Sequence, residues 1–251
     1  MMRALLLAAG MGSRLLPMTL ATPKCLVTID GRLLLDYWLE LLFGAGIERV
    51  LINTHWLAGQ VEDYVKASRW ASRVDLVHED QLLGTGGTVL ANRRWFLDQP
   101  FMLAHADNLT DFDVAGLIAA HRARRPGHVV TMLGFRTNDP HSCGILELDD
   151  RNTVVAFHEK VEHPPGNLAN GAVYIFEPEV IDTIAAKRSA VVDLSTEIIP
   201  GLMGRILCVE TQGYHRDIGT PESLRQARSR LEPKAAASAT RRQRAATRVA
   251  R

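Results

Sequence analysis

The sequence lacks the features that define several common protein classes. Its three cysteines, Cys25, Cys143 and Cys208, are far apart and form no C-x-x-C pair, so neither a disulfide framework nor a zinc site organises the fold. No apolar run approaches the ~20 residues of a membrane-spanning helix. The apolar stretch after Arg3 is too short for a signal peptide and runs into glycines at residues 10–12 instead of a cleavage site. We therefore expect a cytoplasmic protein without a membrane partner.

A strong net charge is also missing. The 251 residues carry a formal charge of +1, whereas residues 232–251 alone carry +5, which leaves −4 on the rest of the chain. This balance argues against nucleic acid as a partner of the folded part. The sequence predicts a single domain over residues 1–230 and a basic, disordered tail over residues 231–251.

Histidine and cysteine clusters with metal-ligand spacing, and nucleophiles paired with a base, are absent as well. The histidines are scattered without ligand spacing, and Ser13, Ser142 and Cys143 have no evident base partner. A covalent enzyme intermediate is therefore not expected.

What the chain does have is an alternation of short apolar strands and amphipathic helices. Strands are predicted at residues 3–9, 49–53, 74–78 and 101–106, and helices at 33–43, 57–67 and 85–91. This rhythm predicts an α/β fold with a Rossmann-like, doubly wound, mostly parallel sheet. Ligands bind such sheets at the carboxyl ends of the strands.

The pattern of predicted elements changes in the second half of the chain. Short strands separated by turn residues are predicted at residues 129–135, 144–148, 153–159 and 171–176. They indicate a mixed sheet over about residues 126–230, which extends a nucleotide-binding half at about residues 1–125.

The loop after the first strand is suited to binding phosphates. Gly10 and Gly12 lack a Cβ, so backbone N–H groups there can approach an anion closely. Leu15 stands where a dinucleotide fingerprint has its third glycine, and neither glycine is followed by the lysine of a Walker loop. Both of these better-known readings are therefore excluded.

The pattern continues with Arg14, Pro17, Thr19 and the pair Pro23-Lys24. In full it resembles the signature of the sugar-phosphate nucleotidyltransferases, which join a nucleoside triphosphate to a sugar 1-phosphate and release pyrophosphate. The resemblance covers about residues 3–225 and implies the nucleotide-diphospho-sugar transferase fold.

The resemblance implies a set of residues around the triphosphate. Arg14 suits the departing phosphates, Lys24 the reacting phosphates, and Asp107 and Asp217 are expected to bind Mg²⁺. His105-Ala106 departs from the Asn-Gly that often precedes the first aspartate. The expected catalytic residues are Arg14, Lys24, Asp107 and Asp217, and the expected nucleotide contacts also include Leu7, Ala8, Ala9, Gly10, Gly12 and Ser13.

The loop at residues 79–88 is expected to bind the nucleobase, with Gly84 and Thr85 in contact. Its L-G-T-G-G form resembles guanylyltransferases more than thymidylyltransferases. Guanine presents two adjacent N–H donors, which the carboxylate of Glu79 can accept. Asp80 is an alternative acceptor.

Four residues of the second half are expected to bind the sugar phosphate. Glu159 and Lys160 resemble the family's F-x-E-K, although Val161 replaces the usual proline. Asn170 resembles the asparagine of an N-x-G-x-Y strand, and Gly144 a glycine whose backbone approaches the hexose.

These resemblances imply a cytoplasmic, Mg²⁺-dependent enzyme whose partners are GTP and a mannose-type or heptose 1-phosphate. Uridylyl or thymidylyl transfer to a hexose or amino-sugar 1-phosphate is the alternative, because residues 53–57 also resemble uridylyltransferases. A non-catalytic nucleotide-sugar sensor would have lost Arg14, Lys24 or an aspartate, and none is lost. The sequence leaves an oligomeric state open.

Overall fold

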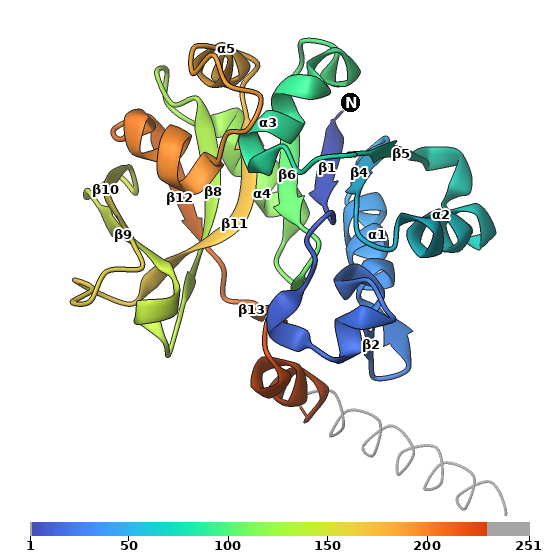
Figure 1. The fold of residues 1–251 in the computed structure, drawn as a ribbon. Helices are drawn as coiled ribbons and strands as arrows, with labels where there is room; N and C mark the ends of the chain where they lie inside the picture. Colours follow the sequence, from blue (N-terminus) through green and yellow to red (C-terminus); the bar gives the residue numbers. More distant parts are fainter. Residues whose placement is uncertain (1, 230–251) are drawn as a thin grey trace, which may run out of the picture.

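Four parallel strands form the centre of the protein, seen here in a computed structural model that describes residues 2–229. They are β1 (Arg3–Leu7), β4 (Val50–Thr54), β5 (Val74–His78) and β6 (Phe101–His105). Their spatial order is β6-β1-β4-β5, and Figure 1 shows β1 between β6 and β4. The predicted basic tail lies outside the described residues.

The chain changes direction across this sheet beside β1. From β1 it proceeds to β4 and β5 on one side, and it then crosses to β6 on the other side. Connections that leave two neighbouring strands in opposite directions open a crevice at the carboxyl ends of these strands. Leu7 at the end of β1 lies level with Asn53 of β4 and with His105 of β6.

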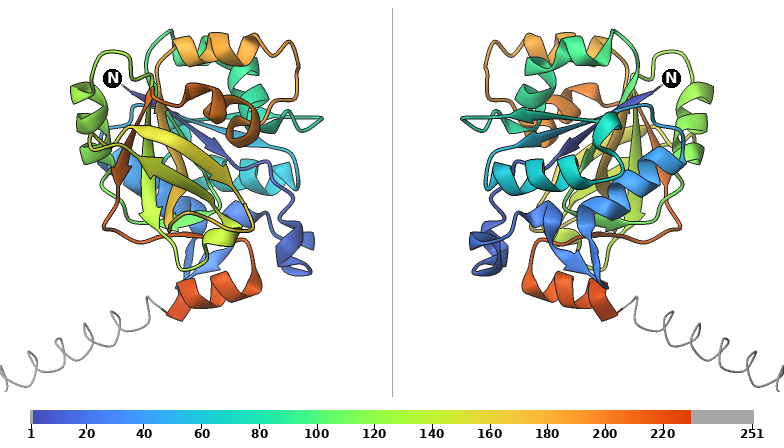
Figure 2. Two further views of the ribbon diagram at one scale, coloured as in Figure 1. Left: turned by 90° about the vertical axis from the view of Figure 1, so that its left-hand side faces the viewer. Right: turned by 90° about the vertical axis from the view of Figure 1, so that its right-hand side faces the viewer.

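Helices cover both faces of the sheet. The side chains of a strand alternate between the two faces, so that Ala4 and Leu6 pack with one core cluster and Leu5 with the other. The first cluster includes residues of α1 (Leu34–Gly44), α2 (Ala58–Ala67) and α4 (Val114–Ala123), and the second includes residues of α3 (Gly84–Ala91) and α5 (Glu179–Ala185). Figure 2 shows the molecule from two opposite sides, with helices on both faces of the sheet. Each fully buried leucine contributes about 1.5–3 kcal/mol to these cores.

The second half extends the same sheet. Strand β11 (Leu168–Phe176) runs antiparallel to β6 and to β8 (Val130–Arg136), and β12 (Ile206–Glu210) runs parallel to β8. The hairpin of β9 (Gly144–Leu148) and β10 (Val154–Glu159) joins β11 through Ala169 and Ile145. In the described part of the chain this sheet has nine strands, and it links the two halves without a break.

Two small strand pairs lie apart from the main sheet. Strand β7 (Asn108–Thr110) pairs antiparallel with β13 (His215–Asp217), and β2 (Thr28–Ile29) pairs with β3 (Arg32–Leu33). The short helical turns are η1 (Ser13–Leu15), η2 (Met18–Leu20), η3 (Lys24–Leu26), η4 (Ala71–Arg73), η5 (Arg93–Phe96), η6 (Pro140–Ser142), η7 (Leu194–Ile198) and η8 (Ile199–Leu202). A third core cluster joins Leu15, Val27, Leu109 and Ile218. It therefore packs the segment after β1 against β7 and the chain after β13.

The predicted fold class is confirmed. The strand predicted at residues 74–78 matches β5, while β11 begins three residues before the predicted residue 171. Helices α4 and α5 and strands β7, β12 and β13 were not predicted. Among the described residues, no helix is long and apolar enough to cross a membrane.

Candidate active site

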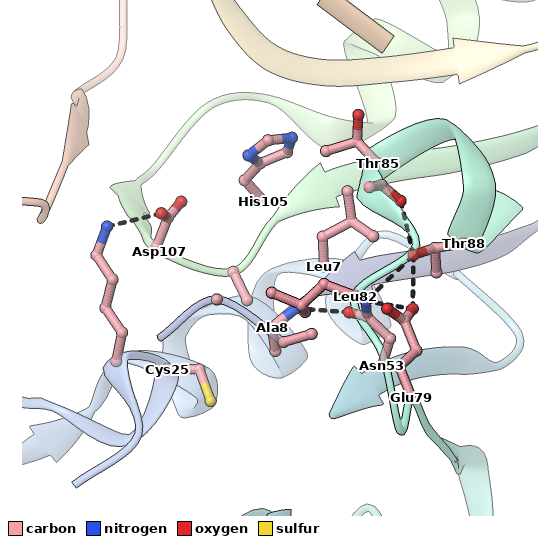
Figure 3. A pocket seen from close by; sticks show the side chains of 15 residues that line it. Leu7, Ala8, Cys25, Asn53, Glu79, Leu82, Thr85, Thr88, His105 and Asp107 are labelled. Atoms are coloured by element: carbon pink, nitrogen blue, oxygen red, sulfur yellow. Dashed lines mark hydrogen bonds and ion pairs between the residues drawn. The ribbon is translucent and has the colours of Figure 1, made fainter. Parts of the chain in front are cut away.

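A cavity of about 220 Å³ lies at the carboxyl ends of β1 and β6. Figure 3 shows Asp107 at one end of it, Asn53 and Glu79 at the other, and Ala8 between them. The predicted nucleotide contacts that line this cavity are Leu7, Ala8, Ala9, Gly10, Lys24, Glu79, Gly84, Thr85 and Asp107. The other predicted residues, Gly12, Ser13, Arg14, Gly144, Glu159, Lys160, Asn170 and Asp217, lie outside its lining.

The antiparallel pair β7–β13 brings the two predicted metal aspartates together. Asp107 directly precedes β7, and Asp217 at the end of β13 lies opposite Asn108. The N–H of Ile218 donates to the carbonyl of Asp107 at 2.9 Å. Two carboxylates 110 positions apart in the sequence therefore face one another across a short ladder.

The ammonium group of Lys24 lies between these carboxylates. Its Nζ donates to Oδ2 of Asp107 at 2.6 Å and to Oδ1 of Asp217 at 2.8 Å. The lysine is only 8% exposed, so its charge has to be paired for the burial to be tolerated. The structure thus brings together three of the four predicted catalytic residues.

Asp107 stays ionised in this setting. Burial by itself raises the pKa of its carboxyl group, but the nearby charges of Lys24 and His105 and the hydrogen bond from Lys24 outweigh burial, and the pKa is lowered from 3.8. The side chain keeps 34% of its surface exposed. A charged carboxylate that opens onto the cavity is available to a cation.

Arg14, the fourth predicted catalytic residue, contacts the same cluster through Asp217. It donates from Nη2 to Oδ2 of Asp217 at 3.1 Å, and 66% of its side chain is exposed. The fork of donors therefore lies at the open rim, where it can contact an incoming anion.

The loop after β1 leaves room for a ligand at Gly10. A Cβ on Gly10 would meet no atom within 4 Å, whereas one on Gly12 would lie 2.8 Å from Cγ2 of Thr19. Gly12 also adopts a φ of +64°, and its carbonyl accepts a hydrogen bond from the Thr19 hydroxyl at 2.8 Å. Gly12 is therefore required by the turn itself, while Gly10 borders the open cavity.

Cys25 also lines the cavity. Burial raises the pKa of its thiol to about 12. The thiol stays protonated at neutral pH and does not act as a nucleophile.

The carboxylate of Glu79 is buried and held by three protein donors. Its Oε1 accepts from Nδ2 of Asn53 at 2.9 Å and from the hydroxyl of Thr88 at 2.6 Å, and its Oε2 accepts from the N–H of Leu83 at 3.2 Å. Of the about four acceptor positions of a carboxylate, one therefore remains, on Oε2. Asp80, the alternative base reader, has a side chain that is 99% exposed.

The predicted base-binding glycines pack against a segment of the second half. The carbonyl of Val192 accepts from the N–H groups of Gly86 and Gly87 at 2.8 and 3.2 Å. A Cβ on Gly84 would lie 2.6 Å from this carbonyl oxygen, and a Cβ on Gly87 would lie 2.2 Å from the oxygen of Ala190. Close approach of residues 190–192 therefore accounts for these glycines.

Thr85 strengthens the same junction. Its hydroxyl accepts from the N–H of Leu194 at 2.7 Å and contacts Oδ2 of Asp193 at 3.3 Å. The amino end of α3 is thus closed by protein groups, which fixes the edge of the cavity.

Three of the predicted sugar-phosphate residues form a cluster of their own at the β9–β10 hairpin. Gly144 lies opposite Glu159, and a Cβ on Gly144 would lie 2.6 Å from Oε2 of Glu159. Lys160 forms an ion pair with Oε1 of Glu159 at 3.3 Å and keeps 63% of its side chain exposed. The hairpin therefore presents a carboxylate and an ammonium side by side.

Asn170 supports an irregularity in β11. Its Oδ1 accepts from the N–H of Ala172 at 2.9 Å, and its Nδ2 donates to the hydroxyl of Tyr174 at 2.6 Å. The register of β11 with β8 shifts between Asn170 and Tyr174. At least part of the hydrogen-bonding capacity of Asn170 therefore maintains the local backbone.

Sequence reasoning quoted the segments that contain Asn53 and Thr88 but did not name either residue as a site residue, and it did not identify the segment at residues 190–194. Asn53 and Thr88 line the cavity, and a polar pair on an apolar strand and helix was the signal that could have revealed them. The 190–194 segment carries no motif, because its role depends on backbone carbonyl groups.

The two aspartates provide a donor set that suits a hard divalent cation. Both carboxylates already converge on one positive charge, and oxygen ligands are those that Mg²⁺ prefers. Within residues 2–229, no group of three or more His, Cys, Asp or Glu side chains forms a metal site. Phosphate oxygens of a ligand would have to complete the coordination.

The fold and the site define an α/β protein with a cavity at the switch point of a doubly wound sheet. The chain belongs to the nucleotidyl transferase family, whose sequence profile matches residues 3–234. The predicted family is thereby confirmed.

The curated relatives are longer than this chain. The mannose-1-phosphate guanylyltransferase of Mycobacterium tuberculosis is 33% identical over 226 residues, which cover 88% of this chain and 62% of that protein. The mannose-1-phosphate guanylyltransferase catalytic subunit beta of Drosophila melanogaster is 30% identical over 232 residues, with 88% and 60% covered. The chain thus spans about three fifths of the length of these relatives.

Solved structures share the fold. HddC from Yersinia pseudotuberculosis superposes with a TM-score of 0.78 at 24% identity, covers 92% of this chain and 100% of its own, and has also been solved complexed with GMP-PN. A protein of Bacillus anthracis assigned as a glucose-1-phosphate thymidylyltransferase, solved with sucrose, has a TM-score of 0.81 at 19% identity, with 91% and 94% covered.

Proposed function

We propose that this protein transfers a guanylyl group from GTP to a mannose-type or heptose 1-phosphate and releases pyrophosphate. The observation that carries the proposal is the cluster of Lys24, Asp107 and Asp217 at the end of the cavity. The relatives named mannose-1-phosphate guanylyltransferases support the choice of base and sugar.

The reaction requires an in-line displacement. An oxygen of the sugar phosphate attacks the α-phosphorus, and the bond from this phosphorus to the bridging oxygen of pyrophosphate breaks. The protein has to hold two anions together and neutralise the charge that develops. Lys24 and Arg14 supply positive charge at the cavity and its rim, and Lys160 supplies it on the β9–β10 hairpin.

Asp107 and Asp217 would hold Mg²⁺ as part of this proposal. The cation would supply charge neutralisation on the phosphates when bound. A cytoplasmic location belongs to the same proposal, because the three cysteines are unpaired and thiols persist in a reducing compartment.

The test is a matrix of nucleotides and sugars. Pyrophosphate release is measured for GTP, ATP, UTP, CTP and dTTP against mannose, glucose, N-acetylglucosamine and heptose 1-phosphates, with Mg²⁺ present. We expect release to be fastest with GTP and a mannose-type or heptose 1-phosphate. Preference for UTP or dTTP would favour the alternative transfer, and tight nucleotide binding without release from any pair would favour a sensor.

A further inference from the structure

We infer that Asn53 is a positioning residue that sets the base selectivity of the site, because its side chain joins the predicted base-reading carboxylate of Glu79 to the phosphate-binding loop at Ala8. The inference rests on the proposed function and adds to it a residue that contacts neither the reacting atoms nor the metal site.

The hydrogen bonds of Asn53 run in opposite directions. Its Oδ1 accepts from the N–H of Ala8 at 2.7 Å, and its Nδ2 donates to Oε1 of Glu79 at 2.9 Å. A rotated amide would place its oxygen against the carboxylate and its NH₂ against an N–H, so both contacts would be lost. Figure 3 shows the Asn53 side chain between the two partners.

The backbone of Asn53 is a rigid anchor for this link. The residue lies in β4, is 3% exposed and pairs with Leu7 of β1. Strand β4 is itself flanked by β1 and β5. An interior strand with neighbours on both sides moves less than the loops that it connects.

The Glu79 carboxylate accepts from two further donors, but these connect it to another part of the protein. Thr88 and the N–H of Leu83 tie the carboxylate to α3 and to the loop before it. Asn53 instead ties the carboxylate to the loop after β1. A base and a triphosphate belong to one ligand, so the distance between their binding groups has to be fixed for both ends to bind at once.

Two substitutions of Asn53 distinguish its contact with Ala8 from its contact with Glu79. Asn53→Asp keeps an acceptor for the N–H of Ala8 but places a second negative charge against Glu79. Asn53→Ala removes both contacts, together with the longer hydrogen bond from Nδ2 to the hydroxyl of Thr88 at 3.4 Å. Thr54→Val is the matched control, because Thr54 is the next residue of β4 and is 2% exposed. The hydroxyl that this substitution removes donates to the carbonyl of Val77, whereas the backbone hydrogen bond from the N–H of Glu79 to the carbonyl of Thr54 is retained.

The experiment measures binding of GTP, UTP and inorganic tripolyphosphate to the full chain by titration calorimetry, with thermal unfolding as a check of folding. In both Asn53 variants we expect the preference for GTP over UTP to fall by about tenfold, the value of one lost charge-assisted hydrogen bond. Asn53→Asp should bind tripolyphosphate within about twofold of the wild type, whereas Asn53→Ala should bind it several-fold more weakly, since only the alanine variant frees the loop.

The outcomes distinguish the inference from the function on which it rests. A wild type without preference for GTP over UTP overturns both. A wild type that prefers GTP, together with Asn53 variants that keep this preference, overturns the positioning role alone. If Asn53→Ala does not fold, Asn53→Asp provides the second test, because it keeps an acceptor for the N–H of Ala8 and should lower the preference while tripolyphosphate binding stays intact. Unchanged preference in that variant contradicts the inference, as does a loss of preference in Thr54→Val.

Discussion

Lys24 pairs with two carboxylates in the structure, and it cannot keep both pairs while it serves the phosphates of the proposed reaction. In the structure its ammonium bridges Asp107 and Asp217, and Arg14 adds a second positive charge to the same group. Two cations and two carboxylates form a neutral cluster. In the proposed reaction Asp107 and Asp217 would hold a divalent cation that supplies charge neutralisation, and the ammonium of Lys24 would then be available to the phosphates.

Removing the charge of either aspartate tests this arrangement. We expect Asp107→Asn and Asp217→Asn each to lower turnover by at least ~100-fold, because each weakens charge neutralisation in the transition state. Pyrophosphate release at saturating substrates is the measurement. Asp98→Asn, a loss of the same charge at an exposed position outside the cavity, is the control and should retain wild-type turnover. Near-normal turnover in either aspartate variant would remove that residue from the metal site.

The base-reading role of Glu79 is tested by a neutral isostere. Glu79→Gln should lower kcat/KM for GTP more than for UTP, since an amide accepts the N–H donors of guanine less strongly than a carboxylate does. Steady-state kinetics with both nucleotides give the ratio. Asp80→Asn is the matched comparison, because this neighbouring acid is exposed. An equal decrease for the two nucleotides would show that Glu79 does not read the base, and a selective decrease in Asp80→Asn would assign the role to Asp80.

At the scale of elements, the amino end of α3 is locked by the segment at residues 190–194. Two N–H groups of α3 bind the carbonyl of Val192, and the N–H of Val192 donates to the carbonyl of Leu83 at 3.0 Å. The predicted base-binding loop belongs to the first half of the chain and its lock to the second. The shape of the nucleotide cavity therefore depends on folding of both halves.

The close packing of α3 against residues 190–192 predicts how one added methyl group changes the free energy of unfolding. Gly87→Ala should lower the free energy of unfolding by about 2–3 kcal/mol, because its Cβ would lie 2.2 Å from a backbone oxygen that cannot move without breaking the lock. Gly59→Ala in α2 is the control: its Cβ would meet nothing within 4 Å, so a stabilisation of up to ~1 kcal/mol is expected. Urea denaturation measures both. Equal stability of the two variants would contradict the tight contact at α3.

The sequence predicted those elements that carry their own pattern. Helix α1 has an apolar face of helical spacing, and β5 is a short apolar strand between turns, so both were located to within a residue. Strand β13 has three residues, too few for any periodicity to show. Its place beside β7 is set by tertiary packing, which is why Asp107 and Asp217 could be assigned separately but their bridge through Lys24 could not be foreseen.

The sequence predicted the site residues that belong to a recognisable motif. It did not predict the roles that depend on a contact with a distant part of the chain. Gly10 and Asp107 follow strands at their carboxyl ends and line the cavity. In the sequence, Asn53 is a single polar residue in an apolar strand, and this pattern does not indicate one particular role. The glycines at residues 84–87 were singled out for binding the nucleobase, whereas the structure shows them packed against backbone carbonyl groups more than a hundred positions away.

For the whole molecule, one continuous sheet fixes the relation between the two predicted substrate sites. Strand β11 lies between β6, which leads to Asp107, and β8, and it also contacts β9 of the sugar-side hairpin. His215 adds a direct link, since it is buried near Asp107 and hydrogen bonds to the backbone of Gly171. Movement of either half would therefore shift both sites.

Stability of the whole fold should depend on pH through His121. The imidazole contacts Thr131 and Glu177 at 2.8 and 3.0 Å, and burial, with a smaller effect of Arg124, lowers its pKa from 6.5 to about 4. In the unfolded chain the histidine takes up a proton first, so its stabilising contribution is complete above pH 6.5 and is lost as the pH falls toward 4. The expected loss is on the order of 3 kcal/mol.

Urea unfolding at several pH values between 7 and 4 measures this effect. His121→Gln should flatten the dependence in that window, while His141→Gln, at an exposed position, should leave it unchanged. An unaltered slope in His121→Gln would show that other groups cause the acid sensitivity.

Removal of divalent cations separates the fold from the chemistry. Because Lys24 already pairs with both aspartates, the site holds together without a metal ion, and excess EDTA should leave the thermal unfolding temperature unchanged. Pyrophosphate release should fall to background under the same conditions and return on addition of Mg²⁺, since the ammonium of one lysine cannot both bridge the carboxylates and neutralise a triphosphate. Thermal scans and pyrophosphate-release assays on one EDTA-treated sample measure the unfolding temperature and the turnover. Turnover that persists in excess EDTA would contradict the magnesium site, and a large decrease in unfolding temperature would show that the cluster depends on a metal ion for its stability.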